Sequence, residues 1–328
     1  MTSAGTEHGM LAYDPELRPA LRSFAGQPAL AEATLATARQ AMIAANQSCA
    51  EAVGDRPISW QDQLIPGPAG APELLVTVLR PTHPQPAAAG IYNIHGGGMM
   101  LDNRFSDLPR LVSLVEEFGC VAVTVEYRLA PEHPHPAPVQ DCYAGLCWMA
   151  EHSEQLGFDP ARLLVIGGSA GGGLAAGVSL LARDLAGPAI AGQLLLCPMI
   201  DDRNDSPSTR RFAESPIWSR ASNTLGWRSL LGDSAGSAAV SGYAAPARAA
   251  ELAGLPAAFV EVGAAEIFLD EDVEYARRLW QAGVPTELHV WAGAYHGFDR
   301  IVPLSELARA ALAARSSWIR RTLGAIEG

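Results

Sequence analysis

One serine set between glycines constrains this chain more than any other feature. Ser169 stands in the segment GGSAG at 167–171, directly after the apolar run 163–166 and before the small-residue run 173–177. An apolar strand, a glycine-flanked serine and a helix are the context of a nucleophile elbow, a sharp turn that pushes the serine hydroxyl into the open. The pattern alone is weak evidence, because a glycine-rich turn before a helix can also cradle a phosphate.

A second glycine motif makes the first one specific. The segment HGGG at 95–98 lies upstream of Ser169. The pair of motifs predicts an enzyme with a nucleophilic serine. A serine hydroxyl is a poor nucleophile at neutral pH, so such an enzyme needs a base and a carboxylate that orients the base.

The order of elements predicts the fold. From about residue 72, continuous apolar strand-like runs alternate with helical patterns, which indicates a mostly parallel sheet covered on both faces. The strand-like runs are 74–79, 90–94, 120–125, 163–166, 190–197, 257–262 and 286–290, and the helical patterns are 108–118, 138–156, 171–185, 272–282 and 305–323.

Two histidines follow Ser169 and could supply the base. His289 sits inside a strand-like run, where a structural role is expected. His296 sits in the glycine-flanked loop GAYHGF at 293–298, after that strand. In this type of site the chain order is serine, then acid, then histidine, so we assign the base to His296.

The acid should follow the strand at 257–262, where Glu266 and Asp270 are the two choices. Asp270 stands just before a helical run with acidic first-turn residues, which favours an N-cap role. Glu266 has no such local duty and lies nearer the end of the strand. We therefore prefer Glu266.

The chain resembles the hormone-sensitive-lipase-like esterases (bacterial family IV) of the α/β-hydrolase fold. The matching stretches lie in the family's order and span about 90 to 300: HGGG at 95–98, YRLAPEHP at 127–134, GGSAGG at 167–172, GAAEIFLDE at 263–271 and YHGF at 295–298. The resemblance implies a catalytic triad of Ser169, Glu266 and His296. It also implies an oxyanion hole made by the backbone N–H groups of Gly97, Gly98 and Ala170.

Three positions depart from the family pattern. Gly168 replaces the usual Asp before the serine, so support from that carboxylate is absent. Glu266 replaces the commoner Asp, and its extra methylene should still reach His296. Met99 and Met100 follow the glycines where the family often has a bulky aromatic residue, which suggests a pliable substrate-binding pocket or, alternatively, simple core packing.

Two regions do not fit the strand–helix alternation. Residues 1–50 contain an amphipathic helical pattern at 29–45, and 201–233 is polar, with Trp218 and Trp227 at roughly helical spacing. We expect these segments to form a helical cap over the strand ends, the alternative being peripheral packing. The chain is then one domain, 1–328, with its catalytic core at 72–200 and 234–328.

Composition limits the partners. The net charge is −12, all 23 basic residues are arginine, and no basic run occurs, which argues against nucleic acid and anionic membrane surfaces. No apolar run is long enough to span a bilayer. Five cysteines without C-x-x-C spacing predict free thiols in the cytoplasm. We expect no metal or other cofactor, and a homodimer is left open.

These observations predict a serine carboxylesterase whose partner is a small-molecule ester. The cap segments carry only scattered large apolar residues, whereas a lipase lid needs a broad apolar surface. We therefore expect soluble, short-chain substrates hydrolysed through an acyl-enzyme. Two alternatives use the same fold: a lactone hydrolase, amide hydrolase or acyltransferase on the same triad, and a non-catalytic small-molecule receptor, which would usually lack a triad member.

Overall fold

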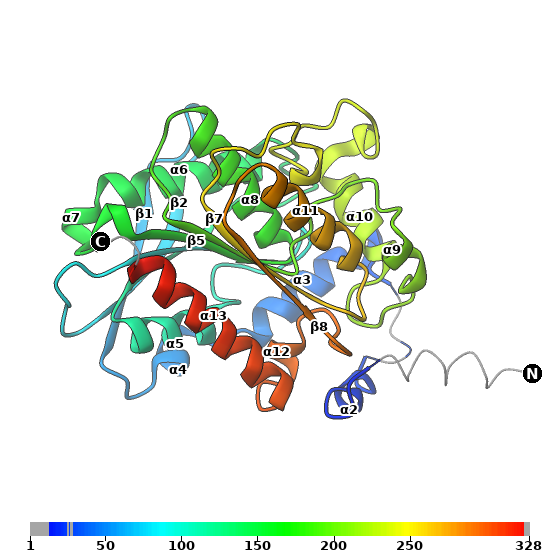
Figure 1. Ribbon diagram of the computed structural model, residues 1–328, viewed down its shortest axis with the longest axis horizontal. Coiled ribbons are helices and arrows are strands. Elements are labelled where there is room, and N and C mark those ends of the chain that lie inside the picture. Colours follow the sequence, from blue (N-terminus) through cyan, green and yellow to red (C-terminus); the bar gives the residue numbers. More distant parts are fainter. Residues whose placement is uncertain (1–12, 25, 27–28, 325–328) are drawn as a thin grey trace, which may run out of the picture.

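A twisted eight-stranded sheet forms the centre of the computed structural model, which describes residues 13–24, 26 and 29–324 (Figure 1). The strand order is β1-β2-β4-β3-β5-β6-β7-β8. The strands are β1 (Ile58–Ile65), β2 (Leu74–Pro81), β3 (Gly90–Ile94), β4 (Val121–Glu126), β5 (Leu163–Gly168), β6 (Gly192–Leu196), β7 (Ala257–Gly263) and β8 (Thr286–Trp291).

The predicted, mostly parallel sheet is confirmed. All pairs from β4 through β3, β5, β6 and β7 to β8 are parallel, whereas β2 pairs antiparallel with both β1 and β4. Strand β1 was not predicted from the sequence. Most of its central residues are exposed, as its polar sequence ISWQDQLI requires, so an apolar strand pattern is missing at this edge of the sheet.

Alternating side chains divide the core into two layers. In β5, Leu163 and Val165 pack in one cluster, while Leu164 and Ile166 pack in the other. Helices α6, α8 and α11 cover the first face, and α4, α5 and α13 cover the second (Figure 1). The helices are α2 (Arg18–Leu21), α3 (Leu35–Ala45), α4 (Cys49–Val53), α5 (Leu108–Phe118), α6 (Ala137–Glu151), α7 (Ser153–Leu156), α8 (Ala170–Asp184), α9 (Pro207–Arg211), α10 (Arg220–Leu231), α11 (Leu269–Gln281), α12 (Phe298–Ile301) and α13 (Glu306–Gly324).

The five helical patterns predicted for the core are confirmed with small changes. The pattern at 138–156 is divided into α6 and α7 at His152. Helix α11 begins at Leu269, three residues before the predicted start. Within the described residues, no helix is both long enough and apolar enough to cross a membrane.

The two segments expected to form the cap contact each other and the glycine loop after β3. The N–H of Leu30 donates to Ser222 Oγ in α10 at 3.1 Å. Arg39 in α3 donates to the carbonyl oxygen of Met100. Whether these segments act as a cap over a substrate stays a prediction. Residues 1–12, 25, 27 and 28 of the expected cap, and 325–328 of the expected core, lie outside the described residues.

Candidate active site

The turn between β5 and α8 holds Ser169 in a conformation that few residues adopt. Its φ is +56° and its ψ is −124°. The flanking glycines are required sterically: a Cβ on Gly167 would overlap the carbonyl oxygen of Gly171, and a Cβ on Gly171 would overlap that of Ile94. The backbone strain at Ser169 is the kind found at functional sites, and the residue is partly exposed.

Three parallel strands bring Ser169, Glu266 and His296 together. Each residue follows the carboxyl end of its strand, β5, β7 or β8, and these ends lie along the same edge of the sheet. His296 Nε2 lies 3.0 Å from Ser169 Oγ, and His296 Nδ1 lies 2.5 Å from Glu266 Oε2. The side chains predicted as nucleophile, base and acid therefore form one continuous hydrogen-bonded line.

Glu266 and His296 are held in a mostly buried setting. Glu266 is fully buried, and its second oxygen, Oε1, accepts the N–H of Gly263 at 2.8 Å. His296 is 8% exposed, and the ring of Phe268 meets its ring edge to face at 5.2 Å. Both oxygens of the glutamate are thus occupied, one by the histidine and one by the end of β7.

Asp270, the other candidate acid, has a different structural role from the one predicted. It is not the N-cap of its own helix, because α11 already begins at Leu269. Its Oδ2 instead accepts the N–H of Ser208 in α9 at 2.6 Å, and Ser208 Oγ accepts the N–H of Asp270 at 3.1 Å. The prediction of a cap for α11 was wrong; the carboxylate joins α9 to α11 instead.

The glycine loop after β3 lies against the serine turn. A Cβ on Gly96 would lie 3.4 Å from Ser169 Cβ, and Gly97 and Gly98 have positive φ values of +101° and +62°. Within the described part of the chain, no acceptor takes the N–H of Gly97 or Gly98. Ala170 is the first residue of α8, where an N–H has no intrahelical acceptor. All three amides predicted to form an oxyanion hole are thus unengaged beside Ser169.

Residues that the sequence analysis did not single out fix this loop. Tyr127 Oη donates to the carbonyl oxygen of His95 at 2.9 Å, and the two rings stack at 4.2 Å. Arg39 donates to the carbonyl oxygens of Met100, at 2.6 Å, and Ala130, at 2.7 Å. Nothing in the sequence around Arg39 signals this contact with a loop about sixty residues away.

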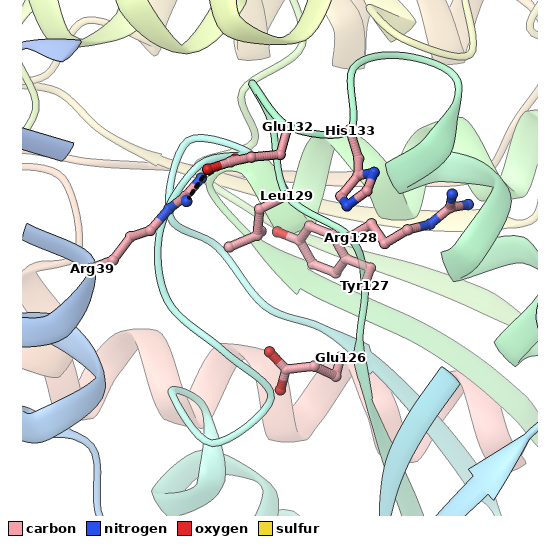
Figure 2. Close-up of a pocket in the computed structure, with 7 residues that line it drawn as sticks. All are labelled: Arg39, Glu126, Tyr127, Arg128, Leu129, Glu132 and His133. Carbon is pink, nitrogen blue, oxygen red and sulfur yellow. Dashed lines mark hydrogen bonds and ion pairs between the residues drawn. The ribbon is translucent and has the colours of Figure 1, made fainter. Parts of the chain in front are cut away.

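Arg39 also crosses a pocket of about 340 Å³ between α3 and the segment after β4 (Figure 2). Figure 2 shows its guanidinium meeting the Glu132 carboxylate, with Nη1 at 2.6 Å from Oε1. The hydrogen bonds from Arg39 lower the pKa of Glu132 to about 2. None of the predicted site residues lines this pocket; its lining is Arg39, Glu126, Tyr127, Arg128, Leu129, Glu132 and His133.

Met99 and Met100 are fully buried behind the glycine loop. Their methyl groups lie near two helix glycines, Gly173 in α8 and Gly226 in α10. The loop surface is covered instead by Trp218: a Cβ on Gly98 would overlap Cη2 of that indole. Contact of the methionines with substrate stays a prediction, and Trp218 is an additional residue beside the site.

The N-terminal segment supports the loop that carries His296. The N–H of Asp14 donates to the carbonyl oxygen of Gly293 at 2.9 Å. Leu17, which directly precedes α2, and Leu21 in α2 pack in a small cluster with Tyr295 and Phe298, which lie on either side of His296 in the sequence. Segments almost three hundred residues apart in sequence therefore hold the imidazole in position.

Two further acids near the site, Glu271 and Asp272, lie in the first turn of α11. Burial and the nearby Asp201 raise the pKa of Glu271 well above its usual range, although its Oε1 accepts the N–H groups of Ile200 and Asp201. Burial and the neighbouring Glu271 and Glu266 do the same for Asp272, which is fully buried. Neither oxygen of Asp272 has a hydrogen-bond partner among the described residues.

One set of side chains has a donor composition suited to a metal ion. Cys197 Sγ, a carboxylate oxygen of Glu266 and a ring nitrogen of His296 lie within 4.8 Å of one another.

His289, the histidine that was not assigned as the base, lies in β8. Its ring stacks between the rings of Phe259 in β7 and Trp291 in β8, which is the structural role expected for it.

Known proteins resemble this chain over most of its length. A family model described as the alpha/beta hydrolase fold matches residues 91–300. The chain is 35% identical to the esterase LipI of Mycobacterium tuberculosis over 72% of this chain and 74% of that protein. It is 30% identical to an ethyl acetate hydrolase of Pseudomonas putida, again over 72% and 74%.

A solved structure extends the likeness to the whole fold. A bacterial heroin esterase superposes with a TM-score of 0.88 at 38% identity, covering 96% of this chain and 99% of that one. The chain belongs to the α/β-hydrolase family, among the hormone-sensitive-lipase-like carboxylic ester hydrolases. The resemblance inferred from the motifs is confirmed.

Proposed function

We propose that this carboxylesterase hydrolyses small, water-soluble esters with short acyl chains through an acyl-enzyme on Ser169. His296 is the general base, and Glu266 is the acid that orients it. The observation that carries the proposal is the hydrogen-bonded line from Ser169 Oγ to His296 Nε2, at 3.0 Å, and from His296 Nδ1 to Glu266 Oε2, at 2.5 Å.

Acylation begins when Ser169 Oγ attacks the ester carbonyl carbon and its proton moves to His296 Nε2. Glu266 stabilises the imidazolium formed in this step. The negative charge that develops on the carbonyl oxygen is taken by the N–H groups of Gly97, Gly98 and Ala170, and losing one such donor typically costs about 10²–10³ in rate. The imidazolium then gives its proton to the departing alcohol as the ester C–O bond breaks.

Deacylation repeats these steps with water. His296 Nε2 takes a proton from a water molecule, whose oxygen attacks the acyl-enzyme carbonyl. The tetrahedral intermediate collapses, the acid product leaves, and the proton returns to Ser169 Oγ. Apart from the ester and the water molecule, the groups used in these two steps are side chains and backbone amides of the chain itself.

Trp218 supports a small substrate. Its indole lies against Gly98 and is fixed by a hydrogen bond from Nε1 to Asn223 Oδ1 at 3.1 Å. A rigid ring over an oxyanion-hole glycine limits the length of the group bound there. Met99 and Met100 lie behind the same loop, and we propose that they form a pliable backing for the pocket.

The surface of the cap segments also supports soluble substrates. Among the described residues of 13–50 and 201–233, only Ile43 is a strongly exposed large apolar side chain. Interfacial lipases need a broad apolar lid surface, so hydrolysis without interfacial activation is expected. A cytoplasmic location suits a chain whose five cysteines are all free thiols.

An ester chain-length series tests the substrate class. We expect the highest kcat/KM for p-nitrophenyl esters of roughly two to eight acyl carbons, because the Trp218 indole against Gly98 should limit chain length. Trp218→Ala should move the optimum to longer chains. Trp60→Ala, which removes an exposed tryptophan on edge strand β1, is the matched control and should leave the profile unchanged.

Three results would contradict the proposal. One is a preference for acyl chains beyond about twelve carbons. Another is a sharp rise in rate where a short-chain ester passes its solubility limit. The third is faster turnover of matched amides or lactones than of the esters, which would favour another acyl-transfer chemistry on the same residues.

A further inference from the structure

Cys197 lies beside the proposed catalytic pair, and no step of the proposed mechanism uses it. The residue follows β6 with a φ of +40° and is partly exposed. Its backbone N–H donates to the carbonyl oxygen of Glu261 at 2.6 Å, and the N–H of Gly297 hydrogen-bonds to its sulfur. These contacts fix the thiol next to the loop that carries His296.

The donor atoms form a set that prefers one class of metal ion. Cys197 Sγ, a Glu266 oxygen and a His296 ring nitrogen lie within 4.8 Å of one another. Thiolate, imidazole and carboxylate are the ligands of Zn²⁺ and related soft ions, which hold them roughly 3.5 Å apart in a tetrahedral site. Small side-chain shifts would close the three atoms around such an ion.

We propose that a zinc-class divalent cation binds Cys197, Glu266 and His296 and thereby inhibits the enzyme. The inhibition rests on the proposed function, whereas the binding does not. Water or Ser169 Oγ completes the coordination, since tetrahedral sites with three protein ligands take a fourth, exchangeable one.

Coordination removes the base from catalysis whichever ring nitrogen binds. If Nε2 binds the ion, its lone pair is no longer available to the Ser169 hydroxyl. If Nδ1 binds the ion, the single proton of the neutral ring lies on Nε2, which then has no lone pair facing Ser169. In both cases Oγ, 3.0 Å away, loses its proton acceptor.

The charges balance in the bound state. The cation forms a bond to sulfur as the thiol releases its proton to solvent, so one thiolate and the Glu266 carboxylate together neutralise a divalent ion. Burial and the nearby Glu266 raise the pKa of the Cys197 thiol well above its usual range. A bound cation reverses this effect, because its own charge favours the thiolate.

Zn²⁺ inhibition of ester hydrolysis tests the proposal. We expect Zn²⁺ to inhibit the wild-type chain and Cys147→Ala alike, because Cys147 is a partly exposed thiol outside the cluster. Cys197→Ser and Cys197→Ala should keep their esterase activity. They should need at least about tenfold more Zn²⁺ for half-inhibition, since even loss of a residue that only supports a metal ligand costs about 10–100-fold in affinity.

A measurement that needs no activity separates the two proposals. Cd²⁺ added to Ser169→Ala should give an ultraviolet thiolate-to-metal charge-transfer band, and the band should be absent when Cys197→Ser is added to that variant. A Cys197-dependent band in this variant, together with a wild-type chain that hydrolyses no ester, would leave the site standing and overturn the proposed function. Equal Zn²⁺ sensitivity with and without Cys197, or a band that survives its replacement, would overturn the site.

Discussion

Two groups of largely buried acids lie on opposite faces of the sheet, and within the described residues only one of these two groups is paired with arginine. On the α13 face, Glu261 and Asp299 both contact Arg315, with Nη1 at 2.7 Å from Asp299 Oδ2. On the α11 face, Glu271 and Asp272 form no ion pair with arginine within the described residues. Figure 1 shows the two helices on either side of the sheet.

Pairing with arginine decides whether a buried carboxyl group is ionised. Burial opposes ionisation of Asp299, yet Arg315 and Arg110 bring its pKa to about 2. Burial likewise opposes ionisation of Asp107, and Arg110 and Arg300 lower its pKa all the same. Burial without such a partner raises the pKa of Asp272 well above the usual range. An acid that is largely buried beside arginine is therefore ionised, whereas burial without arginine favours the neutral form.

Glu266 belongs to the α11 side and has a third kind of partner. Its neighbours are the imidazole of His296 and the N–H of Gly263 rather than a guanidinium. An arginine there would neutralise the carboxylate permanently and compete with the histidine for it. Because no arginine among the described residues pairs with Glu266, this acid is left to the charge that forms on His296 during the reaction.

The largest effect is expected from replacing Glu266, the acid that hydrogen-bonds to His296. Glu266→Gln should lower kcat by about 10³–10⁴-fold, because the imidazolium loses its counter-charge and its orientation. Asp270→Asn is the matched control: the side chain contacts Ser208 instead, and replacing its charged acceptor with a neutral one should mainly cost stability, up to about 1 kcal/mol. Steady-state kinetics of both variants check the assignment, and a reversal of the two effects would show that the acid was misidentified.

Removing the arginine from the paired group should come next. Arg315→Met should cost about 3–5 kcal/mol in the free energy of unfolding, because Glu261 and Asp299 would lose the arginine that contacts both of them. Urea unfolding measures it. Arg321→Met, on the same helix but in an exposed pair with Glu287, should cost no more than about 1 kcal/mol.

The loss of stability in Arg315→Met should also depend on pH, which tests whether charge is its cause. The contribution of Asp299 is present above its unfolded pKa of about 4 and is lost as the pH falls toward its folded pKa of about 2. The gap between wild type and Arg315→Met should therefore narrow below pH ~4. A gap that is independent of pH would mean that packing, not charge, accounts for the loss.

Removing the charge of an acid in the unpaired group should raise the free energy of unfolding instead of lowering it. Asp272→Asn should stabilise the chain by about 1 kcal/mol, since it removes a buried carboxylate that has no partner. A folded pKa above the unfolded one means that wild-type stability falls as the pH rises through the folded value. The gain should thus grow with pH in urea unfolding, whereas Glu274→Gln, on the exposed side of α11, should show no such growth.

The smallest effect is expected from adding an acid beside arginine. A Cβ on Gly168 would lie 3.8 Å from Arg110 Nη2, and Arg110 Nη1 has no hydrogen-bond partner among the described residues. Gly168→Asp should therefore be tolerated and stabilise by up to about 1 kcal/mol relative to the uncharged Gly168→Asn. Thermal unfolding of the pair checks this; a less stable Asp variant would show that Arg110 is already satisfied by Asp107.

The sequence predicted best those features that depend on residues close together in the chain. The elbow at Ser169 and the placement of Glu266 and His296 after successive strands could be predicted, because the end of a parallel strand sets the position of the next residues. The predicted sheet and helices followed from apolar periodicity. Strand β1 was missed because its edge position leaves polar side chains in the pattern.

Contacts between distant segments could not be predicted in the same way. Asp270 bonds to Ser208, 62 residues away, so its local context suggested a cap for the wrong helix. Arg39 reaches Met100, 61 residues away, from a helix whose pattern shows only amphipathicity. The arginine pairing of one acid group depends on α12, α13 and β7 meeting in space, which no single stretch of sequence encodes.

Covalent labelling tests the central claim most directly, namely that Ser169 is the only nucleophile and is activated by His296 and Glu266. An organophosphonate should add once to the wild-type chain, with the adduct mapped by peptide mass spectrometry to Ser169. Ser169→Ala, shown to be folded by an unchanged unfolding transition, should take up no label and hydrolyse no ester. Full labelling of that variant, or an adduct on another residue of the wild type, would contradict the account.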